Sequence, residues 1–349
     1  MVEKDKSIVF LSYLQSDYSR SGVYFDGLRE DFADYVSIRT ALFSAVIDLW
    51  RLRRSINLEN KSILVMSPSH KITILARAVL RKEIILDAGW ALSEASIGPK
   101  KAGPRTLRIV KNFVVDFLSF HSANKTILES QQEVDYISKR FLIPKKKLRF
   151  VYTGLNESKF QKNQVKDNAF DKMRLQVLFR GKKNDEAGIS NILNATLILE
   201  NEPIDFIILT NKDLSEFKSS KNTKIISSYL TNDEITDFYL RSDVCLGQFS
   251  EHKRLERTIP HKAFESLYFS RCYLTPRTSP LESMCVTLKE IFFTNSAKPE
   301  DLAKSLLLLE KNRDLIRETA TSGHALYRSS LRQAHLAELV KGICFEETD

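Results

Sequence analysis

The stretch Gln248–Ser266, QFSEHKRLERTIPHKAFES, decides how the rest of this sequence is interpreted. A short apolar run at 243–247 precedes it and predicts a buried strand that ends in a glycine. A basic loop then leads through Thr-Ile-Pro into an apparent helix that carries Lys262 and Glu265. Unpaired N–H groups at a helix N-terminus, together with nearby cations, favour a bound phosphate. A carboxylate one turn inside the helix can accept hydrogen bonds from ribose hydroxyls. The alternative is an ordinary strand–loop–helix unit with solvated charges.

The first 155 residues predict a parallel α/β domain, because apolar runs typical of buried strands alternate with amphipathic segments. Strands are expected at 7–13, 34–39, 62–67, 83–86, 125–129 and 149–152. Helices are expected at 23–32, 41–54 and 73–80, and in two segments that end near Leu118 and Phe141. Strands that alternate with helices in this way favour helices on both faces of one sheet.

A polar segment without periodicity, 156–172, predicts a linker, after which the same alternation begins again. Strands are expected at 176–179, 206–209, 224–226, 244–246, 272–275 and 291–293. Helices are expected at 189–199, 233–241, 299–310, 313–317 and 329–343, besides the one in Gln248–Ser266. We therefore expect one domain at 1–155, a second at 173–328, and a C-terminal helix at 329–349.

Composition limits the class of protein. A length of 349 residues suits two domains, and no apolar run approaches the ~20 residues that cross a bilayer. The four cysteines lack metal-ligand spacing, and the first residues lack the pattern of a signal peptide, so we expect a cytoplasmic protein with reduced thiols. The net charge of +9 favours an anionic partner: a phosphorylated ligand, a membrane surface or nucleic acid. Nucleic acid ranks last, because the basic stretches lack interleaved aromatic residues and any recognition motif.

Four motifs, in their order and spacing, carry a family resemblance. They are FLIPKKKLRFVYTGL at 141–155, VLFRGKKNDEAGI at 177–189, the segment 229–246 that ends in a buried strand, and TIPHKAFE at 258–265. Together they resemble the retaining glycosyltransferases of family 4, which contain the glycosyltransferase group 1 domain. The resemblance covers nearly the whole chain and is most specific in its second half.

The resemblance implies the GT-B fold, with two Rossmann-like parallel-sheet domains facing a central cleft and a C-terminal helix that crosses back to the N-domain. It implies transfer of a sugar from a UDP- or GDP-linked donor to a glycan, lipid-linked or other hydroxyl acceptor, with retention of anomeric configuration. It further implies a front-face displacement without cofactor or metal, in which Lys and Arg side chains face the diphosphate.

The resemblance assigns donor binding to three strand ends and one helix start of the second domain. The residues are Arg180, Gly181, Lys182, Lys183, Thr210, Asn211, Tyr229, Leu230, Thr258, Ile259, Pro260, His261, Lys262 and Glu265. Lys182 lies where the family has a diphosphate-binding arginine, and Glu265 matches the second glutamate of its EX7E motif. We take Lys182, Arg257 and Asp87 as the catalytic candidates.

Two positions differ from the family pattern and keep alternatives open. Arg257 replaces the first glutamate of EX7E, and Ala187 stands where the family has a lysine. Either Arg257 supplies the missing cation, which we favour, or the chain is a non-catalytic GT-B subunit that supports a partner transferase. A nucleotide-sugar epimerase of the same fold is a third reading.

Candidates in the first domain depend on fewer signals. Arg20, Ser21 and Gly22 match a small-residue loop that closes on the diphosphate in the family. Tyr24 is expected to face the acceptor. Trp90 could stack on a sugar or pack a cleft wall.

Asp87 and two basic segments each allow two interpretations. Asp87 could contact acceptor or sugar, or serve as a helix cap. The amphipathic stretches 41–54 and 100–118 could lie on an anionic membrane surface at its inner face, or cover the first sheet with their apolar sides.

Overall fold

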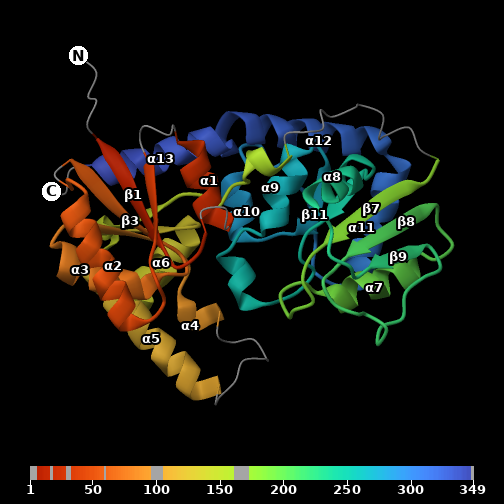
Figure 1. Ribbon diagram of the computed structural model, residues 1–349. Helices are drawn as coiled ribbons and strands as arrows, with labels where there is room; N and C mark the ends of the chain where they lie inside the picture. Colours follow the sequence, from red (N-terminus) through yellow and green to blue (C-terminus); the bar gives the residue numbers. More distant parts are fainter. Residues whose placement is uncertain are drawn as a thin grey trace. The chain divides into compact units, whose positions relative to one another are not determined.

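The computed structural model describes residues 6–15, 19–28, 33–58, 60–95, 105–160 and 173–346 (Figure 1). The chain divides into two compact units, one of residues 1–156 with 333–349 and one of residues 157–332. Most of the predicted linker, at 161–172, lies outside the described residues.

The first unit contains a six-stranded parallel sheet in the order β2-β1-β3-β4-β5-β6. Its strands are β1 (Ser7–Ser12), β2 (Ala33–Ser37), β3 (Lys61–Met66), β4 (Ile84–Gly89), β5 (Lys125–Leu128) and β6 (Leu148–Phe150). Its helices are α1 (Ser19–Gly27), α2 (Leu42–Ser55), α3 (His70–Leu80), α4 (Leu92–Ala95), α5 (Arg105–Ser122), α6 (Gln131–Phe141) and α13 (Gln333–Phe345), with a 3₁₀ turn η2 (Lys145–Lys147).

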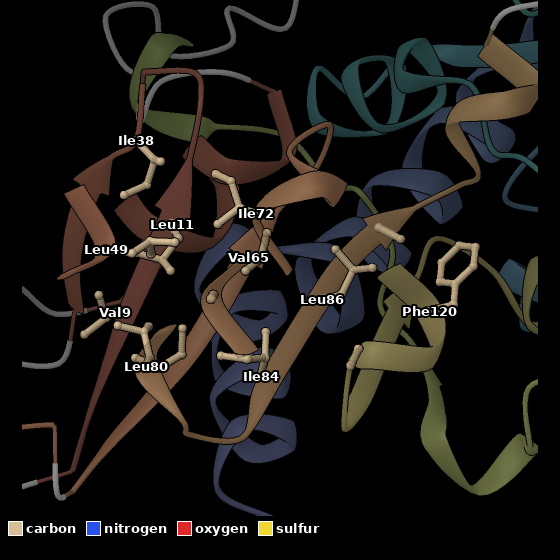
Figure 2. Close-up of a cluster of buried hydrophobic side chains, with 14 of the residues drawn as sticks. Val9, Leu11, Ile38, Leu49, Val65, Ile72, Leu80, Ile84, Leu86 and Phe120 are labelled. Carbon is tan, nitrogen blue, oxygen red and sulfur yellow. The ribbon is translucent and has the colours of Figure 1, made fainter. Parts of the chain in front are cut away.

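Both faces of this sheet are covered, which explains why its strands are continuous apolar runs. Figure 2 shows Val9 and Leu11 of β1 among side chains from α2, α3 and α5. The alternate residues Ile8 and Phe10 lie in a second cluster with residues of α1 and α13. Successive side chains of a strand point to opposite faces, so one apolar run supplies both layers.

The C-terminal helix begins later than the sequence predicts. Helix α12 (Arg313–Leu326) continues into a π-helical turn at Tyr327–Leu331, and Arg332 then takes an extended conformation before α13. The periodic run at 329–343 therefore spans two elements. Helix α13 packs against α1 within the first unit, where its residue Leu336 lies in the core.

The second unit has its own six-stranded parallel sheet, in the order β12-β11-β10-β7-β8-β9. Its strands are β7 (Leu175–Arg180), β8 (Ile204–Leu209), β9 (Thr223–Ile226), β10 (Val244–Leu246), β11 (Cys272–Pro276) and β12 (Phe292–Thr294). Its helices are α7 (Ile189–Ile198), α8 (Asn232–Leu240), α9 (His261–Tyr268), α10 (Ser279–Met284), α11 (Pro299–Lys311) and α12, with short turns η3 (Glu157–Phe160) and η4 (Lys253–Glu256).

The predicted fold class is confirmed: all strands expected from the sequence occur, in two parallel sheets. The short helices α4 and α10 were not expected, because four and six residues are too few to display a helical period. None of the described helices is long and apolar enough to cross a membrane.

The contact between α1 and α13 makes a testable prediction about stability. A Cβ on Gly27 would lie 2.7 Å from the Cβ of Ala337 and 2.8 Å from the carbonyl oxygen of Gln333. Although alanine is the better helix former, Gly27→Ala should lower the free energy of unfolding by about 1–3 kcal/mol, because α13 must shift. In Gly342→Ala a Cβ meets nothing within 4 Å, so this variant should gain about 0.5–1 kcal/mol. Urea denaturation measures the free energy of unfolding of both variants. If the two substitutions changed it by equal amounts in the same direction, the close contact between α1 and α13 would be contradicted.

Candidate functional site

The main pocket of the second unit, about 450 Å³ in volume, opens at the carboxyl ends of its central strands. Strand β7 pairs with β8 on one side and β10 on the other, so the chain reverses its direction of travel across the sheet here. Open α/β sheets bind ligands at such switch points. The lining residues are Arg180, Gly181, Lys182, Leu209, Thr210, Asn211, Ser228, Tyr229, Leu230, Ile235, Gln248, His261 and Lys262.

Lys262, a residue of the lining, packs beside Gly181 against a buried aromatic ring. The Lys262 ammonium lies 3.9 Å from the centroid of the Phe179 ring. A Cβ on Gly181 would come within 2.9 Å of that ring and 3.0 Å of Lys262 Nζ. A side chain at position 181 would therefore displace the Lys262 ammonium. Only glycine lets the backbone at this position lie so close to the cation.

Lys262 is 8% exposed, and no described residue accepts a hydrogen bond from its ammonium. Burial lowers its pKa to about 7, with Glu265 opposing the shift and Arg180 adding to it. Near neutral pH the lysine is therefore close to losing its proton. An anion in the pocket would favour the protonated form.

Glu265 organises the cations around it. Its Oε1 accepts a hydrogen bond from Arg180 at 2.5 Å and lies 3.2 Å from Nδ1 of His261. Its Oε2 accepts one from the Tyr239 hydroxyl at 2.5 Å. Burial alone would raise the pKa of Glu265, but the charge of Arg180 and the hydrogen bonds from His261 and Tyr239 hold it well below its usual range. The carboxylate therefore remains ionised and fixes Arg180 at the pocket.

The pocket wall is cationic. Arg180, Lys182 and Lys262 line it, and none of the lining residues is acidic. No side chain caps the N-terminus of α9, which starts after Pro260 beside the pocket. Together these groups favour an anionic ligand with several charges.

Two polar groups of the lining also lack partners among the described residues. They are the Thr210 hydroxyl, 7% exposed, and the side-chain carbonyl of Gln248. Buried polar groups in native proteins are nearly always hydrogen-bonded, so both are available to a ligand. Their presence beside the cations points to a ligand with hydroxyl or amide groups besides its charges.

Nine of the predicted donor-site residues meet in this pocket: Arg180, Gly181, Lys182, Thr210, Asn211, Tyr229, Leu230, His261 and Lys262. Their role in donor binding stays a prediction. Glu265 is not in the lining: it lies behind Arg180 and His261, with a side chain 2% exposed. In this arrangement its hydrogen bonds go to protein, and its predicted contact with ribose stays a prediction.

The other predicted residues of this unit lie beside the pocket. Thr258 and Pro260 line an adjoining hollow of about 10 Å³ that shares Gln248 with the main pocket, and Ile259 is buried. Lys183 pairs with Glu216 at 2.5 Å, away from the lining. Arg257 ends the turn η4 and does not line the main pocket.

Sequence reasoning missed several residues of the site. Leu209, Ser228, Ile235 and Gln248 line the pocket, and Tyr239 holds Glu265 in place. Ser228 and Gln248 follow predicted strands, so their position at strand ends was a usable signal. No signal in the sequence pointed to Tyr239, because its partner Glu265 is 26 residues away in the sequence.

The charged residues predicted in the first unit satisfy one another. Arg20 Nε donates to Asp87 at 2.8 Å, Nη1 donates to Thr153 Oγ1 and Nη2 to the carbonyl of Leu128. Arg20 is 3% exposed and Asp87 is 0% exposed. Asp87 lies inside β4, so it is not a helix cap, and full burial does not fit its predicted catalytic contact.

The remaining candidate residues of this unit differ in how deeply they are buried. Tyr24 is fully buried and its hydroxyl donates to the carbonyl of Tyr152 at 2.9 Å, which does not fit a residue facing an acceptor. Ser21 and Gly22 are also buried within α1. Trp90 is partly exposed after β4, so its predicted acceptor role stays a prediction.

Comparison by sequence finds no matching protein-family model and no matching curated protein. Comparison of structures finds clear likeness over nearly the whole chain. Sucrose-phosphate synthase of Thermosynechococcus elongatus matches with a TM-score of 0.69 and 9% identity, over 97% of this chain and 98% of that one. Anabaena HepE in complex with UDP matches with a TM-score of 0.71 and 10% identity, over 97% and 99%.

A third match is weaker. A Listeria monocytogenes protein described as a UDP-N-acetylglucosamine 2-epimerase has a TM-score of 0.55 and 11% identity, over 99% of this chain and 98% of that one. Taken with the two parallel sheets, these likenesses show that the chain has the GT-B fold.

The Glu265 cluster makes a prediction about stability. Tyr239→Phe removes a hydrogen bond to a buried carboxylate and should lower the free energy of unfolding by about 1.5–3 kcal/mol. Tyr229→Phe is the matched control, because Tyr229 is 93% exposed and should change nothing measurable. Urea denaturation followed by circular dichroism compares them, and equal stability of the two variants would contradict the role given to Tyr239.

Proposed function

We propose that this chain is a glycosyltransferase that moves a sugar from a nucleotide-diphosphate sugar to a hydroxyl acceptor. One observation carries the proposal: Arg180, Lys182 and Lys262 line a pocket without acidic residues at the switch point of the second sheet. A diphosphate is the ligand that matches several cations and a helix N-terminus. The fold shared with a sucrose-phosphate synthase and with HepE, whose structure contains UDP, supports the same proposal.

The lining of the pocket contains both cationic and apolar residues. Gly181, Lys182 and Lys262 form the cationic part, which suits the diphosphate. Leu230 and Ile235 form an apolar part that suits a nucleobase. We favour a uridine nucleotide, because the similar HepE structures are complexes with UDP and UDP-glucose.

The cations would act on the leaving group. As the bond from the anomeric carbon to the diphosphate oxygen breaks, negative charge grows on the diphosphate, and fixed cations lower the energy of that state. We propose a front-face displacement with retention: the acceptor oxygen bonds to the anomeric carbon on the same face, and its proton passes to the leaving phosphate. Protein cations would neutralise this charge without a metal ion.

We propose a glycan or lipid-linked hydroxyl acceptor at the first unit, with Trp90 as its contact. Asp87 and Tyr24 would support the fold of that unit, since both are buried. Arg257 lies outside the lining of the main pocket, so its role as the cation that Ala187 cannot provide stays a prediction. Ala187 is 2% exposed and belongs to the core of the second unit.

Calorimetry with UDP and GDP tests donor binding. We expect UDP to bind, and Lys262→Met to weaken it at least tenfold, because the variant removes a buried cation from the pocket. Lys183→Met is the matched control and should bind as the wild type does, since Lys183 pairs with Glu216 outside the lining. Absence of binding by any nucleotide would overturn the proposed function.

Affinity for UDP should also depend on pH. Because the pKa of Lys262 in the free protein is lowered to about 7, the lysine loses its proton as pH rises above 7. Binding of a diphosphate then requires uptake of a proton, so affinity should fall between pH 7 and 9, by at most about tenfold per pH unit. UDP itself is fully ionised in this range, since phosphate ionises near pH 6. Lys262→Met should abolish the slope, and an unchanged slope in that variant would contradict this origin.

The likeness to the Listeria protein favours one second candidate, a nucleotide-sugar epimerase. Epimerisation in D₂O exchanges a sugar C–H for deuterium, whereas transfer consumes donor only with an acceptor. Proton NMR of UDP-sugars with the purified chain distinguishes the two. Binding without exchange, hydrolysis or transfer would favour a non-catalytic subunit.

A further inference from the structure

Helix α5 of the first unit carries an unusual apolar face toward solvent. Leu107 is 67% exposed, Val110 53%, Val114 49%, Phe117 38% and Leu118 46%. Residues at spacings of three and four lie on the same side of a helix, so the five side chains form one continuous stripe. From Leu107 to Leu118 the stripe is about 16 Å long, at a rise of about 1.5 Å per residue.

The opposite face of α5 is firmly anchored, so the stripe does not result from a loosely packed helix. The Asp116 carboxylate accepts hydrogen bonds from the N–H groups of Leu92 and Ser93, at 2.9 and 2.8 Å. The Ser119 hydroxyl donates to the carbonyl of His70 at 2.8 Å. Phe120 belongs to the buried cluster of Figure 2, which also contains Ile72 and Leu80 of α3. The helix therefore has a satisfied inner face and a separate apolar outer face.

Basic residues border the stripe. Lys111 and His121 are exposed on α5 itself. The end of α6 adjoins them, because His121 Nε2 lies 3.0 Å from the carbonyl of Phe141, and it adds the exposed Lys139 and Arg140. Leu142, 78% exposed, extends the apolar surface at this end.

The acidic residues of α5 and α6 are either buried or paired with a lysine. In α5 the sole carboxylate is Asp116, which is buried, and in α6 Glu133 is buried while Asp135 pairs with Lys145 at 2.5 Å. The apolar stripe is thus bordered by positive charge without exposed, unpaired negative charge among the described residues of these two helices.

We propose that this outer face of α5 docks on a membrane surface that contains anionic lipid. An interfacial helix needs an apolar stripe that enters the headgroup region by about 5–10 Å and a basic border that meets lipid phosphates. A protein partner fits less well, since stable protein interfaces bury about 800 Å² on each partner, and a stripe one helix wide offers less. The proposal does not depend on the transferase activity, although it would bring the first unit to lipid-linked acceptors.

Vesicle sedimentation with the full chain tests this docking. We expect binding to phosphatidylcholine vesicles with 30% phosphatidylglycerol and at least tenfold weaker binding to phosphatidylcholine alone. The triple variant Leu107→Gln, Val114→Gln, Leu118→Gln should bind at least tenfold more weakly than wild type. Its matched control is Leu308→Gln with Leu339→Gln, which alters leucines 48% and 45% exposed on other helices and should bind normally.

Charge variants test the second half of the proposal. Lys111→Gln and Lys139→Gln should each weaken binding to anionic vesicles roughly fivefold. Unfolding midpoints and UDP calorimetry of all variants should match wild type, which separates this surface from the donor pocket. Absence of vesicle binding, or binding that is equally strong in the triple variant, would overturn the proposal. So would concentration-dependent dimerisation of the wild type in light scattering that the triple variant abolishes, since the stripe would then serve a second copy of the chain.

Discussion

The ion pair between Arg180 and Glu265 joins the end of β7 to the first turns of α9, and the geometry of the pocket depends on it. Glu265 is almost fully buried, and a buried carboxylate is tolerated only when its oxygens are satisfied. Arg180, His261 and Tyr239 provide those partners. The carboxylate thereby holds an arginine and a histidine at the pocket while remaining outside the lining itself.

The two units use their ion-paired arginines in different ways. Arg20 of the first unit directs its Nε and both terminal nitrogens to protein acceptors, so its charge serves the packing of α1 on the strands. Arg180 retains partial exposure at a pocket whose other cations, Lys182 and Lys262, have no acidic neighbours in the lining. This difference makes the second unit the better candidate for a phosphate ligand. The lowered pKa of Lys262 is the reason that pH should change the affinity for that ligand.

Helix α5 presents a different kind of constraint. Its inner residues are fixed by hydrogen bonds and core contacts, so the helix cannot turn its apolar outer stripe inward. Exposed leucine, valine and phenylalanine side chains raise the free energy of the isolated protein in water, unless another surface covers them. The basic border on α5 and α6 makes an anionic lipid surface the natural complement.

The sequence by itself determined the two parallel sheets and most of the pocket. Buried parallel strands need continuous apolar runs, and ligands bind where such strands end, so the predicted strands together with the family resemblance placed Gly181 and Thr210. The tertiary structure decided which charges face a ligand. Asp87 and Glu265 were both predicted to contact a ligand, but each is buried against an arginine that is distant in sequence. Burial and pairing depend on contacts across the fold, and local patterns do not encode them.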